Sequence, residues 1–143
     1  MFICPGCGRR TAGDRHLGHQ PRGGESCGFG FLFELLDDYY PSPKTALIVC
    51  DQSRKILALG HAATAVTGFR EGDLLGHEVV ERLGIVFTDG TDQVAHCLEW
   101  GVRGKGLDGT FRPSGLAEHR AATFDLFPAY DDDGGIMVAL TPR

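Results

Sequence analysis

The sequence lacks any stretch close to the roughly 20 consecutive apolar residues that a membrane-spanning helix requires. It also lacks a secretory leader, because Pro5 and two glycines interrupt the first apolar residues and charged residues follow at once. Its five cysteines are an odd number, which fits the reducing cytoplasm better than a framework of disulfides. These absences predict a cytoplasmic protein that does not enter a membrane.

An excess of positive charge is also missing. The chain has 14 Lys and Arg residues against 19 Asp and Glu, a formal net charge of −5, which argues against a broad phosphate-binding surface. The stretch 104–106 lacks phosphate-loop spacing, and the acids at 131–133 lack the alternate positions and distant Glu of a calcium loop. Neither a nucleophile with a base nor a pair of carboxylates in an apolar setting stands out. We therefore expect no catalytic activity.

The chain divides by composition. A length of 143 residues fits one domain with a small appendage. Residues 1–28 are rich in Gly, Arg, His and Cys and carry almost no apolar periodicity, so hydrophobic burial alone cannot fold them and a bound metal is the simplest source of order. The predicted organisation is a zinc-binding finger at residues 1–28, a linking helix at 29–43 and a main domain at 44–143.

The metal prediction starts from the motif Cys4-Pro5-Gly6-Cys7-Gly8, whose two cysteines have the spacing of half a tetrahedral zinc site. Cys27-Gly28 repeats the Cys-Gly ending of this motif. A second C-x2-C would place its first cysteine at position 24, but Gly24 stands there, so a histidine must complete the site. The predicted ligands are Cys4, Cys7, His19 and Cys27, with His16 as the alternative to His19. Four protein ligands leave no open position for water, so the zinc would be structural.

Four arginines lie within the predicted finger, which raises nucleic-acid binding as an alternative. Acidic residues follow closely at 34, 37 and 38, and no recognition helix with C2H2 spacing is present. The pattern disfavours a nucleic-acid-binding finger.

The stretch GFGFLFELLDDYY at residues 28–40 predicts a helix over Phe29–Tyr40, ended by Pro41 and Pro43. On a helical wheel its apolar residues cover roughly 200°, about twice the arc that packing on one domain needs. The excess indicates burial between finger and main domain, or contact with a second copy of the chain or a protein partner.

The sequence pattern of the main domain predicts two strands, then a run of helices, then three strands. A polar turn separates the first two strands, and the acidic, glycine-rich stretch 131–135 predicts a hairpin between the last two. The predicted strands are 45–50, 56–59, 109–112, 120–127 and 136–140; the predicted helices are 62–66, 71–75, 78–83 and 91–102.

Over residues 45–143 this order resembles the PAS sensory-domain family. The resemblance rests on the first hairpin, with Asp51 and Ile56-Leu57, and on Thr67-Gly68-Phe69 followed by Glu71, Leu74-Leu75 and Gly76. It rests also on the closing hairpin. His61 stands where the family usually has Asn, so the usual cap of the first short helix is in question. The resemblance implies an α+β fold, a five-stranded antiparallel sheet with helices on one face, and a core able to hold a small ligand.

PAS domains sense ligands, redox state or light, or they dimerise and dock partners, and a CPxCG finger ahead of one looks like a small bacterial regulatory protein. The leading hypothesis is a non-catalytic signalling protein that acts as a homodimer or through a protein partner, by way of the helix Phe29–Tyr40. The alternatives are a sensor that holds haem or another small molecule in its core, and a nucleic-acid-binding regulator.

Haem is disfavoured by the positions of the histidines. Haem-binding members of the family carry an axial His on the long helix, where this chain has His96. The apolar stripe of that helix is predicted to face inward and consists of Val94, Leu98, Gly101 and Val102. His96 lies on the opposite side of the helical wheel, so it is expected to face solvent. His119 falls in the outward phase of its strand. Cys50 and Cys97 are expected to be buried small hydrophobes, and the helices between 62 and 83 hold no cysteine for a flavin adduct.

Overall fold

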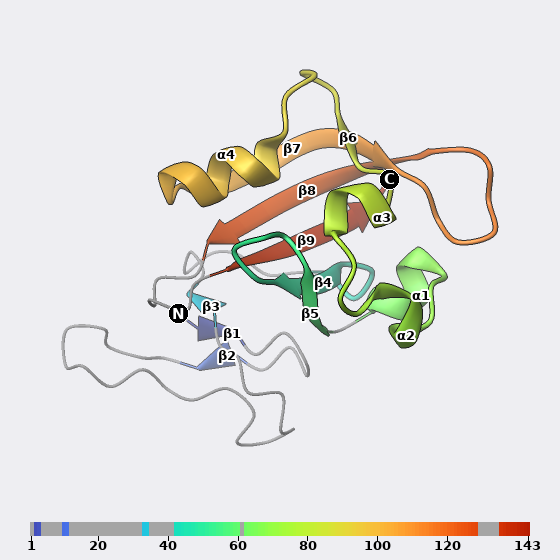
Figure 1. The fold of residues 1–143 in the computed structure, drawn as a ribbon, viewed down its shortest axis with the longest axis horizontal. Coiled ribbons are helices and arrows are strands. Elements are labelled where there is room, and N and C mark those ends of the chain that lie inside the picture. Colours follow the sequence, from blue (N-terminus) through green and yellow to red (C-terminus); the bar gives the residue numbers. More distant parts are fainter. Residues whose placement is uncertain (1, 4–9, 12–32, 35–41, 61, 129–134) are drawn as a thin grey trace.

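The computed structural model describes residues 2–3, 10–11, 33–34, 42–60, 62–128 and 135–143. Its main body is a six-stranded antiparallel sheet in the order β5-β4-β9-β8-β7-β6, with helices on one face (Figure 1). The strands are β4 (Ala46–Cys50), β5 (Ile56–Leu59), β6 (Val86–Phe87), β7 (Gly104–Phe111), β8 (Arg120–Pro128) and β9 (Ile136–Pro142). The helices are α1 (Ala63–Thr67), α2 (Glu71–Leu74), α3 (Val79–Arg82) and α4 (Gln93–Trp100).

A second, small sheet is formed by three two-residue strands in the order β2-β1-β3: β1 (Phe2–Ile3), β2 (Arg10–Thr11) and β3 (Phe33–Glu34). Both pairings are antiparallel, with Ile3 opposite Arg10 on one side and opposite Phe33 on the other. In Figure 1 the small sheet lies near the end of the main sheet at which β8 ends and β9 begins.

The central strands of the main sheet are apolar on both faces. Alternate residues of β4 point to opposite sides, so Ala46, Ile48 and Cys50 join the core beneath the helices while Leu47 and Val49 face the other way. The helix-side core also holds Phe87, Phe111, Ala122, Phe124, Leu126, Ile136, Val138 and Leu140. We call the other side the outer face; its apolar cluster is Leu47, Val49, Phe127, Met137 and Ala139, with Ala58 packed against it.

The first hairpin is closed by Asp51, as the polar turn predicted. Its carboxylate oxygen Oδ1 accepts hydrogen bonds from the backbone N–H groups of Ser53 at 2.8 Å and Lys55 at 2.9 Å. A carboxylate in this position accepts hydrogen bonds from backbone N–H groups that find no backbone acceptor within a tight turn.

The first helix, α1, begins without a side-chain cap: Ala62 occupies its N-cap with φ +59° and makes no side-chain cap hydrogen bond. His61, where the family usually has Asn, lies outside the described residues.

The α+β fold with helices on one face of an antiparallel sheet is confirmed, but the prediction of five strands is wrong. The sixth strand, β6, pairs Val86 with Thr110 and Phe87 with Gly109. Two residues are too few to show a period in the sequence. Strand β7 also begins five residues earlier than predicted, because a bulge between Gly104 and Leu107 extends it, with Gly106 at φ +66°.

The predicted linking helix Phe29–Tyr40 is wrong where the structure describes it: Phe33–Glu34 is a strand paired with β1. The sequence carries the competing signal, since Phe29, Phe31 and Phe33 alternate with other residues at the period of two that strands show. The rest of the predicted helix lies outside the described residues. None of the helices described is long and apolar enough to span a bilayer.

Gly109 on β7 provides a test of how tightly the helix-side core is packed. A Cβ atom there would lie 2.6 Å from the carbonyl oxygen of Val86 and 3.0 Å from Phe124 Cε2. We expect Gly109→Ala to lower the free energy of unfolding by about 1–3 kcal/mol in urea denaturation, because backbone and ring must both move. The matched control is Gly72→Ala on α2, where nothing lies within 4 Å of the new Cβ. An equal loss in both variants would contradict the close approach of β6 to β7.

Candidate functional site

The predicted metal ligands Cys4, Cys7, His19 and Cys27, and the alternative His16, all lie outside the described residues. The strands that flank them are described. Because Ile3 pairs with Arg10, residues 4–9 connect two paired antiparallel strands. Because Ile3 also pairs with Phe33, β1 ends where β3 begins, at the same end of the small sheet.

Elsewhere, the described residues contain no group of three or more His, Cys, Asp or Glu side chains placed to hold a metal ion.

Helix α4 lies over β7 and β8 (Figure 1). Val94 and Cys97 are its buried residues and Leu98 is partly buried against the same core. The predicted inward stripe is thus right at Val94 and Leu98 but wrong at Gly101 and Val102, which are exposed, Val102 by 43%. The helix ends at Trp100, and Gly101 turns the chain with φ +62°, so Val102 no longer follows the helical period. Cys97 lies in the core instead of Val102.

Side chains of α4 and of the sheet approach each other closely at Gly104. A Cβ atom on Gly104 of β7 would lie 3.4 Å from Cys97 Sγ on α4 and 2.7 Å from Leu107 Cδ1. Next to them the rings of Phe87 and Phe124 meet edge to face, with centroids 5.2 Å apart and an interplanar angle of 61°. The helix therefore rests directly on the strands at this position.

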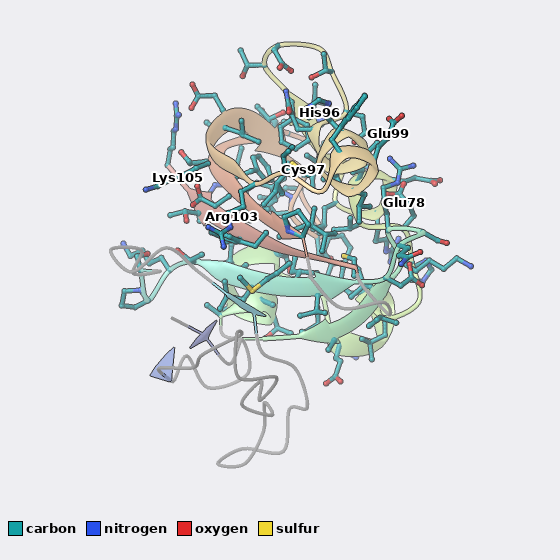
Figure 2. All side chains as sticks on the ribbon, turned by 90° about the vertical axis from the view of Figure 1, so that its left-hand side faces the viewer. Glu78, His96, Cys97, Glu99, Arg103 and Lys105 are labelled. Atoms are coloured by element: carbon teal, nitrogen blue, oxygen red, sulfur yellow. The ribbon has the colours of Figure 1, made fainter. Side chains whose placement is uncertain are left out.

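Both candidate haem ligands are exposed, as predicted. His96 and Glu99 lie on the outside of α4, whereas Cys97 turns toward the sheet (Figure 2). His119 lies just before β8, also exposed, with its Nδ1 atom 3.3 Å from the Thr110 hydroxyl. Neither imidazole reaches the core in which an axial ligand would have to stand.

Cys50 and Cys97 are free and buried, which confirms the prediction that they are small core residues. Burial raises the pKa of the Cys50 thiol far above its ordinary range, and the Asp51 and Glu78 carboxylates raise it further. Burial likewise raises the pKa of the Cys97 thiol. Both stay protonated at neutral pH and are poor nucleophiles.

Arg54 joins the first hairpin to two helices. Its Nε atom lies 3.6 Å from Glu78 Oε1, and its Nη1 atom pairs with the Asp92 carboxylate. Glu78 caps α3 by accepting from the Val80 N–H at 2.8 Å, and Asp92 caps α4 by accepting from the Ala95 N–H at 3.0 Å. The ion pairs are partly exposed and contribute little stability by themselves, but they hold the guanidinium at both helix starts. Sequence reasoning missed this cluster because its members are up to 38 residues apart.

A pocket of about 320 Å³ opens at the rim of the sheet, between the β6–α4 connection and β7. The Asp89 carboxylate in its wall accepts hydrogen bonds from the Thr91 backbone N–H at 3.0 Å, the Thr91 hydroxyl at 2.8 Å and Gln93 Nε2 at 2.5 Å. These bonds lower the pKa of Asp89, the one from the Thr91 backbone most. Asp108, also in the wall, pairs with Arg143. The lining residues are Phe87, Thr88, Asp89, Gln93, Gly106, Leu107 and Asp108.

No protein-family model matches the chain, and no curated protein matches it in sequence. Solved structures do match, among them PAS domains. The PAS domain of an HTR-like protein from Haloarcula marismortui superposes with a TM-score of 0.51 at 18% identity, covering 69% of this chain and 79% of that one. A variant of the fungal photoreceptor Vivid gives a TM-score of 0.55 at 12% identity, covering 77% and 89%. A chain of the E. coli DhaR(N)–DhaL complex gives 0.51 at 15% identity, covering 72% and 33%. At these identities the likeness shows the fold alone, which is that of PAS domains.

The buried thiol of Cys50 predicts a pH dependence of stability. Thiols of an unfolded chain ionise near pH 8.5, whereas the raised pKa keeps Cys50 protonated in the fold. Above pH 8.5 the unfolded state alone loses this proton, so stability falls as pH rises, by up to about 1.4 kcal/mol per pH unit. Cys50→Ala removes this term, so we expect the stability difference between wild type and variant to shrink by about 2 kcal/mol between pH 8 and pH 10. Urea denaturation at both pH values measures it, and a constant difference would contradict it.

Proposed function

We propose that this chain is a non-catalytic regulatory module of PAS fold that acts by binding protein, either a second copy of itself or a different chain, and whose first 28 residues fold around one structural zinc ion. The observation that supports protein binding over a ligand held in the core is the packing beneath α4. Cys97 of α4 lies against β7 at Gly104, and the rings of Phe87 and Phe124 meet edge to face. Close packing at this position favours a module that works through its surface.

The surface offers a suitable contact at the end of α4. Trp100 is 66% exposed and Val102, two residues on, is 43% exposed. The His96 ring lies 6.5 Å from that of Trp100 and extends the aromatic surface along the helix. Exposed tryptophans of this kind are over-represented among the residues that dominate protein–protein binding energy. The DhaR(N)–DhaL complex offers a precedent, since a chain of similar fold is found there bound to protein.

The zinc proposal is supported by the spacing of Cys4 and Cys7. It is supported also by the small sheet, in which Ile3, directly before Cys4, pairs with both Arg10 and Phe33. Cys4, Cys7, Cys27 and one of His19 and His16 would hold the ion. It would supply the folding free energy that the apolar content of residues 1–28 does not.

The zinc proposal predicts a metal stoichiometry. Metal analysis of purified protein should find about one zinc per chain, and Cys4→Ser should lose it because three ligands bind the ion far more weakly than four. The control is Cys97→Ala, which removes a buried core thiol and should leave the metal content unchanged. Wild-type protein without zinc, or Cys4→Ser with its zinc retained, would refute the site.

Native mass spectrometry tests the protein-binding proposal, because it reports subunit number, bound partner and retained small molecules together. We expect a dimer or a complex with a second protein, and we expect Trp100→Ala to weaken it at least tenfold, since truncating a central tryptophan typically costs more than about 1.4 kcal/mol. Leu116→Ala, at an exposed leucine of the loop before β8, is the matched control. Equal affinity of both variants would contradict a contact through Trp100.

A second candidate, small-molecule binding, is favoured by the rim pocket, which has apolar walls from Phe87 and Leu107 and carboxylates from Asp89 and Asp108. The same native mass spectra distinguish protein binding from small-molecule binding. A small molecule released on denaturation from a monomeric protein would favour the pocket over the protein contact.

A further inference from the structure

Arg54 stands in the turn between β4 and β5, in a backbone conformation that few residues other than glycine adopt. Its φ angle is +68°, in the left-handed region. Asp51 fixes this conformation, because its carbonyl oxygen accepts a hydrogen bond from the Arg54 N–H at 3.0 Å and its carboxylate accepts one from the Lys55 N–H at 2.9 Å. A glycine would fit the same turn without strain, so the backbone alone does not require arginine here.

The side chain of Arg54 contacts the first residues of two helices. Its Nε atom lies 3.6 Å from Glu78 Oε1 at the start of α3, and its Nη1 atom pairs with the Asp92 carboxylate at the start of α4. The backbone adds a third contact, since the Arg54 carbonyl oxygen accepts a hydrogen bond from the Val79 N–H at 2.8 Å. One residue of the hairpin therefore contacts α3 twice and α4 once.

Both carboxylates that pair with the guanidinium also cap a helix. Glu78 accepts hydrogen bonds from the N–H groups of Val80 at 2.8 Å and Glu81 at 3.2 Å. Asp92 accepts one from the N–H group of Ala95 at 3.0 Å. Amides in the first turn of a helix have no partner within the helix itself. Because the guanidinium already restricts the rotamers of both carboxylates, capping costs them less conformational entropy.

Helix α4 has little else to hold its start. It is eight residues long, shorter than the roughly 12–15 residues that an isolated helix needs in water. The chain that leads into it is exposed from Thr88 to Asp92, and Val94 is the first buried side chain of the helix. The cap at Asp92 and its ion pair with Arg54 therefore have a large share in keeping the first turn of α4 closed.

We propose that Arg54 is a clamp that holds the first turns of α3 and α4 closed together, so that both turns open when its ion pairs break. The guanidinium is the group that the caps Glu78 and Asp92 share. Because the ion pairs are partly exposed, dissolved salt weakens them, so the clamp is sensitive to ionic strength. The clamp acts within the domain and depends neither on zinc nor on a protein bound at Trp100.

Amide hydrogen exchange of the full chain, followed by NMR, tests the clamp in Arg54→Gly. This substitution removes both ion pairs and also relieves the left-handed backbone, so the fold is kept while the side chain is lost. We expect exchange to accelerate at least about threefold at Val80, Glu81 and Ala95, as the loss of partly exposed ion pairs implies, and to stay unchanged in β8 and β9. Acceleration in only one of the two helices would overturn the proposal, and so would equal acceleration throughout the domain.

Lys55→Ala is the matched control, because it removes a cation from the next position of the same turn. It should leave exchange at Val80, Glu81 and Ala95 unchanged. Acceleration there equal to that in Arg54→Gly would contradict a specific role of Arg54.

A double-mutant cycle shows whether the effect passes through the ion pair with α4. Asp92→Asn keeps a cap, since Asn and Asp are about equally good N-caps, but it removes the charge that pairs with Arg54. We expect Asp92→Asn to accelerate exchange at Ala95 in the wild-type background and to have no further effect in the Arg54→Gly background. Equal effects in both backgrounds would overturn the proposal. A protein that binds no partner through Trp100 yet shows this cycle keeps the clamp and removes only the proposed function.

Discussion

Burial on both sides of the central strands is the constraint on which the rest of this structure depends. β4, β9 and β8 present apolar side chains alternately up and down, as continuous hydrophobic strands do, and each side must be covered. The helices cover one side and fix the positions of the capping acids Glu78 and Asp92. The other side carries the apolar cluster of Leu47, Val49, Phe127, Met137 and Ala139. The two apolar faces and the charged cluster at Arg54 both follow from this one requirement.

The strands that pack on both faces were the easiest to locate from the sequence. Thr45–Cys50, Ile56–Leu59 and Ile136–Leu140 are short apolar runs bounded by polar or glycine-rich turns, and the structure places strands there within a residue or two. Their location needed no knowledge of their partners, because the pattern is local. The burial of Cys50 and Cys97 was predictable for the same reason.

The parts that could not be predicted depend on distant contacts. Strand β6 exists because Val86 and Phe87 find β7, and two residues carry no period. Phe33–Glu34 fits a helical wheel and an alternating pattern equally well, and pairing with β1 decides between them. The contact of Arg54 with both helix starts, and the rim pocket, assemble residues that are far apart along the chain. Of the candidate site, the spacing of the cysteines could be recognised in the sequence. The position of α4 against Gly104 could not be predicted, because a glycine has no side chain to contribute to a hydrophobic pattern.

The two strands that border the main sheet have a consequence for the behaviour of the protein at high concentration. β6 is two residues long and β5 is four, while the strands between them run to nine. Unpaired backbone groups along a border strand are a template for stacking one molecule on the next into fibres. Borders this short give an incoming strand very few donors and acceptors, so a protein whose interior strands are strongly apolar is protected from polymerising through its own sheet.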